Sequence, residues 1–487
     1  MRRRLLPLVA WAAVASVAHG APPAPVETAH RMVLNGHPVR YTAEAGQVAI
    51  RDVATGEAHG YIFYVDYRLP AKTGGPPRPV TFVWNGGPGA DSATLDFHVA
   101  GPKRAVDGRL VDNPKSWLAG TDLVFVDPVG TGFSRPTKAE YESEFYGTIG
   151  DVASVTEFVR SWRILHGAED APLYLIGESW GAGRAGSVGY ALQKRGVPVT
   201  GLMLISGGAG LNSEHTPRNL AEALRVVDLA ETARFHHKLP DGPASDHAAI
   251  ERWARTVYAP ALQAPEALSD AQRAAILAQL AVYTGLPADQ IDAKTLRITP
   301  RGFRTGLLKA QGKTLDVFDM RKSGAERGPP EAPAILRFLR HDLGYRTDAP
   351  YVGLEPIETG YAPTGKYPQG VGSRWNYATG PATKEEVAAA MAEAQRTGAG
   401  PPRIGAPLPS VEELVALNPK VKVLVAAGQY DSLNSCAANA ETGQRLAGAV
   451  AQAVTFRCYT GGHMMYGDEA TRLVLSQDVI RLVGGAR

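Results

Sequence analysis

A short apolar segment that runs into a glycine-flanked serine is the feature that most constrains how this chain folds. Residues 173–176 are apolar, the next five read Gly-Glu-Ser-Trp-Gly around Ser179, and a helical pattern continues to Arg195. Small residues around the serine allow a sharp turn from a buried strand into a helix, which projects the hydroxyl beyond the strand. Glycine and serine also populate ordinary turns. The strand before and the helix after this motif nevertheless predict that Ser179 is a nucleophile.

Other segments predict a mostly parallel sheet with helices on both of its faces. Several apolar runs are continuous, as in parallel strands that are buried on both sides. Helical patterns at residues 151–165 and 180–195 separate some of them, which gives the βαβ alternation of an α/β protein. Residues 47–51 and 60–67 instead suit antiparallel strands at an edge. The continuous apolar runs lie at residues 80–84, 122–126, 173–176, 201–205 and 421–426.

The region from residue 212 to residue 405 departs from this alternation. Helical patterns and loops rich in glycine and proline replace the strand-like runs, which resume only at residue 421. We therefore expect residues 21–211 and 406–487 to form the two parts of one core, with residues 212–405 inserted between them as a largely helical lid.

The first residues have the order of a secretory signal peptide. Three arginines follow Met1, residues 5–17 are mainly apolar, and residues 18–21 are mainly small. An anchoring helix is the alternative, but the apolar run is well short of the ~20 residues that cross a bilayer. We expect residues 1–20 to be removed and the mature protein to be periplasmic or secreted, without an integral membrane span.

Composition excludes several classes of function. The 487 residues are 44% apolar, which suits one large core with an insertion. The formal net charge is +3, and the predicted signal peptide carries three arginines, so the mature chain is near neutral and has no basic block for nucleic acid. No Cys-x-x-Cys pattern occurs, and the pair His236-His237 has no further ligand at metal-binding spacing. We expect no metal and no cofactor.

The partners of a nucleophilic serine in this strand-to-helix context follow it in the order acid, then histidine. Of the twelve histidines only His463 lies beyond residue 341, in a Gly-Gly-His turn. Asp431 follows the strand-like residues 421–427. A surface histidine and an Asx-turn aspartate are the alternatives. The order favours a triad in an α/β-hydrolase fold, in which His463 deprotonates Ser179 and Asp431 orients the imidazole.

Residues 83–89, Val-Trp-Asn-Gly-Gly-Pro-Gly, predict a second element of acyl-transfer chemistry. A tetrahedral oxyanion needs backbone donors, usually the amide after the nucleophile and one from an earlier loop at a strand end. Trp180 supplies the first donor, and the adjacent glycines allow a second amide to approach the substrate. A phosphate-binding loop is the rival interpretation, but the Lys-Ser/Thr of such loops is absent and Pro88 removes an amide donor.

Taken together, these motifs resemble the serine carboxypeptidase family, in its bacterial exported branch. The resemblance spans roughly residues 60–205 and 420–467, and it covers several ordered motifs around the triad. The inserted region matches less distinctly. The motifs are Trp-Asn-Gly-Gly-Pro-Gly at 84–89, Asn-Pro-Lys-Ser-Trp at 113–117, Asp-Pro-Val-Gly-Thr-Gly-Phe-Ser at 127–134, Gly-Glu-Ser-Trp at 177–180, Gly-Gln-Tyr-Asp at 428–431 and Gly-His-Met at 462–464.

The resemblance implies roles for the residues around the triad. The amides of Gly87 and Trp180 would form the oxyanion hole. Asn85, Gly86 and Glu178 would hold the C-terminal carboxylate of a peptide substrate. A carboxylate accepts hydrogen bonds from amides and from a protonated Glu178 but is repelled by an ionised one, so we expect acidic pH to favour peptide binding.

This sequence departs from the family pattern at three positions. The second glutamate that family members carry just before a Gly-Pro is Val99, the usual tyrosine after the serine is Trp180, and the usual cysteine after Gly-Pro-Gly is Ala90. The first departure weakens the prediction of strict C-terminal exopeptidase activity. We therefore predict a serine carboxypeptidase that acts on peptides through an acyl-enzyme, with an esterase or acyltransferase using the same triad as the alternative. The complete triad disfavours an inactive binding protein.

Two further sets of residues have structural interpretations. Cys436 and Cys458 lie between the predicted acid and the predicted base, and one disulfide is possible in an oxidising compartment. Two buried thiols are nearly as plausible from the sequence. Aromatic residues of the inserted region are expected to dock it on the core rather than to line a pocket; these are Tyr361, Tyr367, Trp375 and Tyr377.

Overall fold

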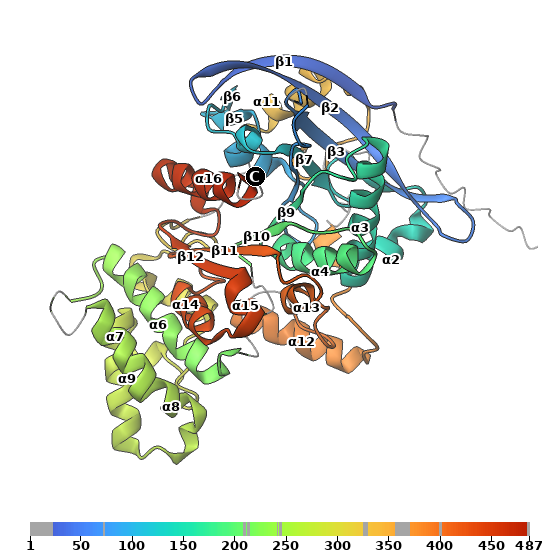
Figure 1. The fold of residues 1–487 in the computed structure, drawn as a ribbon. Helices are drawn as coiled ribbons and strands as arrows, with labels where there is room; N and C mark the ends of the chain where they lie inside the picture. The colour runs from blue at the N-terminus through green and yellow to red at the C-terminus, as the bar shows by residue number, and fades with distance from the viewer. Residues whose placement is uncertain are drawn as a thin grey trace, which may run out of the picture.

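The computed structural model contains a ten-stranded mixed sheet that runs through the centre of the molecule (Figure 1). The predicted signal peptide and the aromatic residues Tyr361 and Tyr367 lie outside the described residues. The structure describes residues 23–71, 74–207, 211, 215–240, 242, 246–324, 330–355, 371–398 and 402–484.

The strand order is β1-β2-β3-β7-β4-β9-β10-β11-β12, and β8 pairs with β3. The strands from β1 to β7 pair antiparallel in that order, and those from β7 to β12 are parallel. A separate hairpin joins β5 (Lys103–Val106) and β6 (Arg109–Asp112). The strands of the main sheet are β1 (Val26–Leu34), β2 (His37–Arg51), β3 (Ala58–Arg68), β4 (Val80–Trp84), β7 (Asp122–Asp127), β8 (Arg135–Pro136), β9 (Leu173–Glu178), β10 (Gly201–Ile205), β11 (Lys422–Gly428) and β12 (Val454–Tyr459).

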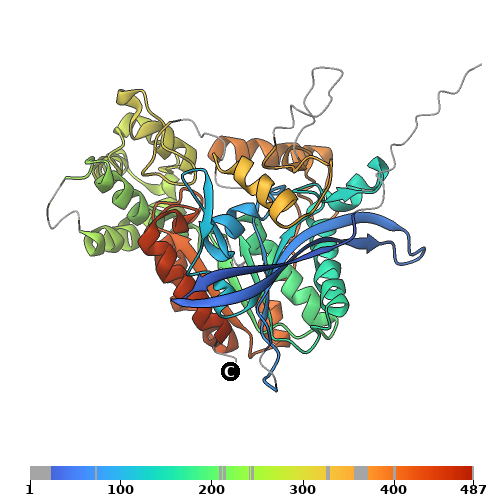
Figure 2. The ribbon, with the colours of Figure 1, turned by 90° about the horizontal axis from the view of Figure 1, so that it is seen from above.

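The predicted α/β class is confirmed, and each continuous apolar run became a parallel strand. Residues 47–51 and 60–67 lie in β2 and β3, which are antiparallel as expected. The antiparallel part is larger than the sequence indicated, because β1 and the first half of β2 form a long hairpin (Figure 2). Most side chains of β1 are partly or fully exposed, so this strand lacks the apolar run that revealed the others.

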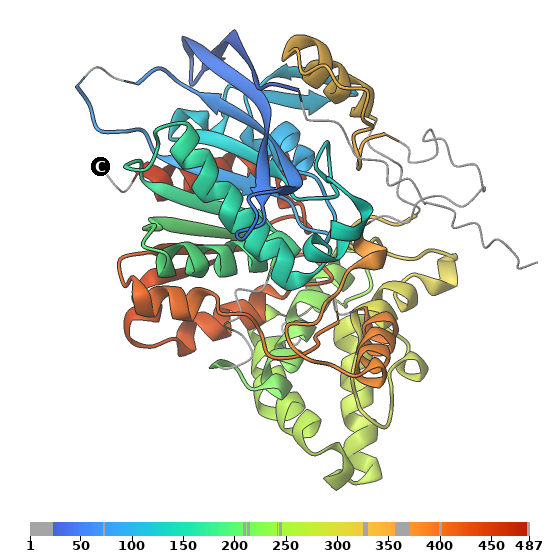
Figure 3. The ribbon, with the colours of Figure 1, turned by 90° about the vertical axis from the view of Figure 1, so that its right-hand side faces the viewer.

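Two apolar cores lie on opposite faces of the sheet. Alternate residues of β9 belong to different cores, Leu173 and Leu175 to one, Tyr174 and Ile176 to the other. α16 (Glu469–Gly484) contributes Leu475, Val479 and Val483 to the second core. The helices on the first core, two of them seen in green beside the strands in Figure 3, are α3 (Thr148–Leu165), α4 (Trp180–Lys194), α13 (Val411–Leu417) and α15 (Gly448–Ala453).

The region between β10 and β11 has two kinds of packing. Five of its helices share an apolar cluster of their own, beside α14 (Cys436–Arg445). By contrast α11 (Ala332–Arg337) and the residues after it add side chains such as Phe338 and Trp375 to the two sheet cores. α12 (Lys384–Thr397) has no buried residue. The five helices are α6 (Arg218–Phe235), α7 (His247–Trp253), α8 (Ala259–Gln263), α9 (Asp270–Thr284) and α10 (Pro300–Gly306).

The remaining α-helices of the described ranges are two short ones, α1 (Ala93–Leu95) after β4 and α2 (Glu142–Phe145) before α3. Within the described ranges, no helix is long and apolar enough to cross a membrane.

Candidate active site

Ser179 lies at the turn between β9 and α4, as the sequence predicted. Its backbone has φ 57° and ψ −123°, a strained conformation for a residue with a side chain. The flanking glycines permit the turn, because a Cβ added to Gly177 would lie 1.9 Å from the carbonyl oxygen of Gly181. The amide of Ser179 donates to the carbonyl of Ile205 at 2.8 Å, which fixes the turn to the end of β10.

Asp431 and His463 are in direct contact at the carboxyl ends of β11 and β12. His463 Nδ1 lies 2.7 Å from Asp431 Oδ2, and both side chains are buried. The carboxylate also accepts from the amide of Leu433 at 2.9 Å and from Asn434 Nδ2 at 2.7 Å. An imidazole held in this way carries its proton on Nδ1 and presents Nε2 as a base.

The structure brings Ser179 to the same end of the sheet but forms no hydrogen bond between Ser179 and His463. His463 Nε2 is buried and has no partner among the described residues. Hydrogen bonds between nucleophile and base are often loose before a substrate binds. The unpartnered Nε2 is therefore the atom available to the serine hydroxyl.

Ser206, which the sequence did not single out, links the two parts of the site. It follows β10 directly, and its hydroxyl donates to the carbonyl of His463 at 2.5 Å. The carbonyl of Ser206 in turn accepts from Asn434 Nδ2 at 2.8 Å. No local motif marks this serine, because its partners are distant in sequence.

The pKa of His463 is raised. Burial of the imidazole lowers its pKa, but the charge and hydrogen bond of Asp431, assisted by the charge of Glu178, outweigh the burial. A general base must be unprotonated to act. Activity that depends on His463 should therefore fall as the pH drops through this raised pKa.

Two segments of the inserted region hold the acid and base loops. Arg225 of α6 donates to the carbonyl of Ser432 at 2.7 Å, and the Ser432 hydroxyl donates to the carbonyl of Val317 at 2.6 Å. The carbonyl of the next residue, Phe318, accepts a hydrogen bond from the amide of His463 at 2.5 Å. The ring centroid of Phe318 lies 5.2 Å from that of the imidazole. The site is therefore assembled from both the sheet and the insertion.

The close approach of these segments makes a prediction about Gly462. A Cβ added there would lie 2.3 Å from the carbonyl oxygen of Phe318 and 2.6 Å from the Cβ of Asp319. Gly462→Ala should displace the loop that carries His463 and lower kcat/KM by about 10–100-fold. Gly467→Ala is the matched control, since a Cβ at Gly467 meets nothing within 4 Å. Equal activity of the two variants would contradict the prediction.

The loop after β4 lies directly over the serine turn. A Cβ added to Gly86 would lie 2.7 Å from the amide nitrogen of Trp180 and 2.8 Å from Ser179 Cβ. Gly87 has φ 100°, which suits glycine. Trp180 is the first residue of α4, so its amide has no acceptor within the helix. The loop residue Gly86 therefore lies against the serine turn, beside the free amide of Trp180.

Asn85 and Glu178 form a buried pair beneath this loop. Asn85 Nδ2 donates to Glu178 Oε1 at 2.8 Å, while Asn85 Oδ1 accepts the amide of Leu95 at 3.0 Å. Burial raises the pKa of Glu178, and the charge of Asp431 acts in the same direction. The charge of His463, the polar contact of Tyr466 and the hydrogen bond from Asn85 oppose this rise. Tyr466 was not predicted from the sequence.

Val99 takes no part in this polar group. It is fully buried in an apolar core, and its carbonyl accepts Asn113 Nδ2 at 2.9 Å. The carboxyl group that the family pattern places here is thus replaced by an apolar contact.

The ring of Trp180 contacts aromatic residues of the region between β10 and β11. Trp375 and Tyr377 pack against it nearly perpendicularly, with ring centroids 5.9 and 5.7 Å away. These two aromatic residues dock the insertion next to the serine, as expected from the sequence.

A disulfide joins Cys436, the first residue of α14, to Cys458 on β12. Their Cα atoms are 5.5 Å apart. The bridge connects the segment that follows Asp431 to the strand that precedes His463, so it restrains both loops of the pair.

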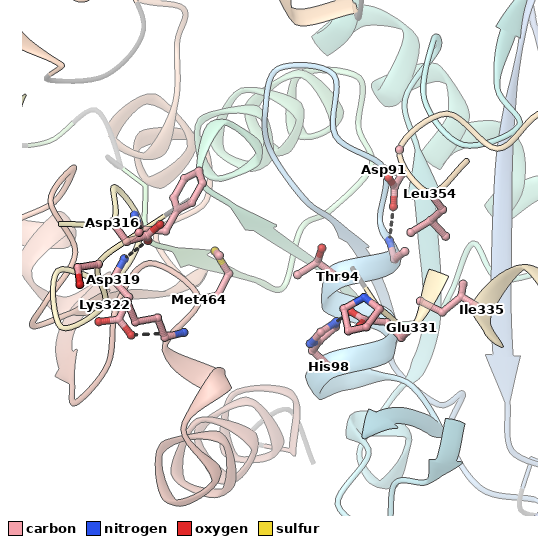
Figure 4. A pocket seen from close by; sticks show the side chains of 16 residues that line it. Asp91, Thr94, His98, Asp316, Asp319, Lys322, Glu331, Ile335, Leu354 and Met464 are labelled. Carbon is pink, nitrogen blue, oxygen red and sulfur yellow. Dashed lines mark hydrogen bonds and ion pairs between the residues drawn. The ribbon is translucent and has the colours of Figure 1, made fainter. Parts of the chain in front are cut away.

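A cavity of about 770 Å³ opens next to the loop that carries His463 (Figure 4). Phe318 and Met464 contact His463 or follow it directly, and both line the cavity. Figure 4 shows polar side chains on two facing walls. His98 and Glu331, paired at 2.8 Å, lie on one wall with Thr94; Asp316, Asp319 and Lys322 lie on the other.

A cluster with the spacing of metal ligands lies away from the triad, on β2, β3 and the residue after α3. Within the described ranges, one group of three side chains has the spacing of metal ligands, namely Glu44, Asp66 and His166. Arg68 lies among them, 2.9 Å from Asp66 and 2.8 Å from Glu44. The guanidinium already supplies the positive charge that the two carboxylates would offer to a cation.

Comparison with known proteins relates the chain to one family. Residues 37–187 match the family model described as serine carboxypeptidase. The pheromone-processing carboxypeptidase KEX1 of Yarrowia lipolytica is 30% identical over 174 residues, 34% of this chain and 27% of that protein. Serine carboxypeptidase-like 50 of Arabidopsis thaliana is 32% identical over 145 residues, 27% of this chain and 31% of that protein. The matched segments thus span less than a third of either relative.

The fold also matches a solved structure over nearly its whole length. The prohormone-processing carboxypeptidase Kex1(Δ)p of Saccharomyces cerevisiae superposes with a TM-score of 0.55, covering 91% of each chain at 14% identity. At this identity the likeness concerns the fold, which is that of the α/β-hydrolases. Together with the sequence matches around the serine turn, this likeness in fold relates the chain to the serine carboxypeptidase family.

Proposed function

We propose that the chain is an exported serine carboxypeptidase that releases C-terminal residues from peptides, with Ser179, Asp431 and His463 as its catalytic triad. One observation carries the proposal: the buried His463–Asp431 pair leaves Nε2 without a partner at the end of the sheet where Ser179 occupies its strained turn. The match of residues 37–187 to the serine carboxypeptidase family model supports a peptidase activity.

In the proposed mechanism His463 Nε2 removes the proton from Ser179 as the hydroxyl oxygen attacks the scissile carbonyl carbon. The amides of Gly87 and Trp180 stabilise the oxyanion. The imidazolium, held by Asp431, then gives its proton to the leaving amine as the C–N bond breaks. Water, deprotonated by His463, hydrolyses the acyl-enzyme and restores the serine.

C-terminal specificity would come from the buried pair beside the triad. We propose that Asn85, the amide of Gly86 and a protonated Glu178 hold the substrate carboxylate. The raised pKa of Glu178 favours its protonated form, which can donate to an anion. Thr94 lines the cavity of Figure 4, and the next residue, Leu95, donates its amide to Asn85 Oδ1. The cavity therefore lies next to the proposed carboxylate site, and we propose that it receives the C-terminal side chain of the substrate.

Export and the role of the insertion are part of the proposal. We infer that residues 1–20 are a signal peptide, and the disulfide between Cys436 and Cys458 supports an oxidising destination such as the periplasm or the medium. We infer that residues 212–405 act as a lid over the site. The contacts of Val317 and Phe318 with the acid and base loops support that role.

An esterase or acyltransferase with the same triad is the second candidate, and the apolar environment of Val99 favours it. The discriminating experiment measures kcat/KM for an N-blocked dipeptide, its C-terminal amide and its ester from acidic to mildly alkaline pH. A carboxypeptidase should prefer the free acid over the amide by about 10-fold or more, since a hydrogen bond to a charged group contributes ~1.5–3 kcal/mol. Hydrolysis of the ester alone, at every pH, would reject the carboxypeptidase.

A further inference from the structure

Three buried polar atoms of the site have no hydrogen-bond partner among the described residues: Glu178 Oε2, Tyr466 Oη and His463 Nε2. Buried polar groups are normally paired, so such atoms need an explanation. The lack of a partner for His463 Nε2 is accounted for by its proposed role as the acceptor of the Ser179 proton. Glu178 Oε2 and Tyr466 Oη remain, and the two side chains lie within polar contact of each other.

Tyr466 is held firmly in place. It lies in a short 3-10 turn, Met465–Gly467, three residues after His463. Its side chain is 3% exposed and packs in the apolar core that also contains Val99. The hydroxyl at the end of this fixed ring interacts with Glu178 and Asn85 but forms a well-defined hydrogen bond with neither.

We propose that Tyr466 is a positioning residue for Glu178, supplying from the base loop the polar contact to Glu178 that Val99 cannot make. This inference rests on the proposed function, because it assigns Glu178 to the recognition of the substrate carboxylate. Asn85 already holds Oε1. Tyr466 would hold Oε2, so the carboxyl group is fixed at both oxygens while it faces the substrate.

The Tyr466 hydroxyl stabilises the ionised form of Glu178 more than the protonated form. A phenol donates a stronger hydrogen bond to an ionised carboxylate than to a carboxyl group. Tyr466 therefore lowers the pKa of Glu178, against the dominant effect of burial. The other groups that act on Glu178 are Asn85 and His463, which also lower its pKa, and Asp431, which raises it.

The substitution Tyr466→Phe tests this role, because it keeps the buried ring and removes only the hydroxyl. In the wild type, kcat/KM for an N-blocked dipeptide should fall on the alkaline side as Glu178 ionises and repels the substrate carboxylate. The variant should move that alkaline midpoint up by about 0.5–1 pH unit. The profile for the dipeptide amide, which lacks the carboxylate, should keep its midpoints.

Tyr459→Phe is the matched control, since it removes another buried tyrosine hydroxyl, one that donates to Asp478 at 2.6 Å. It should leave the alkaline midpoint in place. An unmoved midpoint in Tyr466→Phe, or an equal shift with acid and amide, would overturn the assignment of Tyr466 while leaving the peptidase activity intact. Failure of the wild type to cleave the dipeptide at any pH would instead reject the proposed function.

A double substitution separates an effect through Glu178 from any other effect of Tyr466→Phe, including a slight change in the fold. In the Glu178→Gln background the position has no proton to lose, so adding Tyr466→Phe should produce no further shift of the midpoint. A shift of the same size in that background would show that Tyr466 acts through another group, and would overturn the proposal.

Discussion

Ser179→Ala should lower kcat for an N-blocked dipeptide by about 10⁶-fold, because no other hydroxyl is placed at the turn to attack the carbonyl carbon. The substitution removes one atom, and the strained backbone at φ 57° is borne equally by serine and alanine. The fold should therefore survive, which circular dichroism and the thermal midpoint can check. Steady-state release of the C-terminal residue measures the loss. A variant that keeps a hundredth of the wild-type kcat would contradict the proposal.

The serine and the histidine should also act as a unit. His463→Ala alone should cost about as much as Ser179→Ala, and the double substitution should cost little more than either. Independent additive losses would mean that the two residues do not serve one chemical step.

Asp431→Asn should lower kcat/KM by about 10⁴-fold, and the hydrogen bonds of Asp431 explain why. Oδ2 accepts from both His463 Nδ1 and Asn434 Nδ2, and Oδ1 accepts from the amide of Leu433. If an asparagine at this position keeps its Oδ1 as the acceptor for the amide of Leu433, its NH₂ group replaces Oδ2. That group then faces the two groups that donated to Oδ2, His463 Nδ1 and Asn434 Nδ2. His463 then carries its proton on Nε2 and cannot take one from Ser179.

The measurement for Asp431→Asn is kcat/KM with the dipeptide. Asp478→Asn is the control, since it neutralises another buried aspartate that accepts several hydrogen bonds outside the site. It should leave kcat/KM essentially unchanged. Comparable losses in both variants would point to general destabilisation and not to the orientation of the imidazole.

The parallel part of the sheet could be predicted because its strands are apolar on both faces. Short continuous runs such as residues 201–205, with helices between them, are typical of buried parallel strands. The order serine, acid, histidine located the candidate base, and the strand-like run before Asp431 located the candidate acid. Asp431 and His463 are in contact, although their catalytic roles stay predictions.

The N-terminal hairpin could not be predicted in full for the opposite reason. In β1 every second residue up to Arg31 is exposed, and polar residues such as Glu27 and Thr28 occupy the strand. The strand pairs with β2 over nine residue pairs through backbone groups, and only its last residues, such as Met32 and Leu34, pack in an apolar core.

Supporting residues of the site were missed for a related reason. Ser206, Phe318 and Tyr466 act through contacts with residues far away in sequence or through one buried atom, and none lies in a recognisable local pattern. Tyr466 does follow the Gly-His-Met motif, but nothing in the sequence indicates where its hydroxyl points. Such residues are found only when the surrounding segments are placed in space.

Covalent labelling tests the central claim most directly. The folded protein is treated with a fluorophosphonate, and the modified residue is identified by peptide mass mapping. The account predicts a single adduct on Ser179, formed more slowly at pH values below the raised pKa of His463 and absent in Ser179→Ala. An adduct on another residue, or folded protein that remains unlabelled, would contradict it.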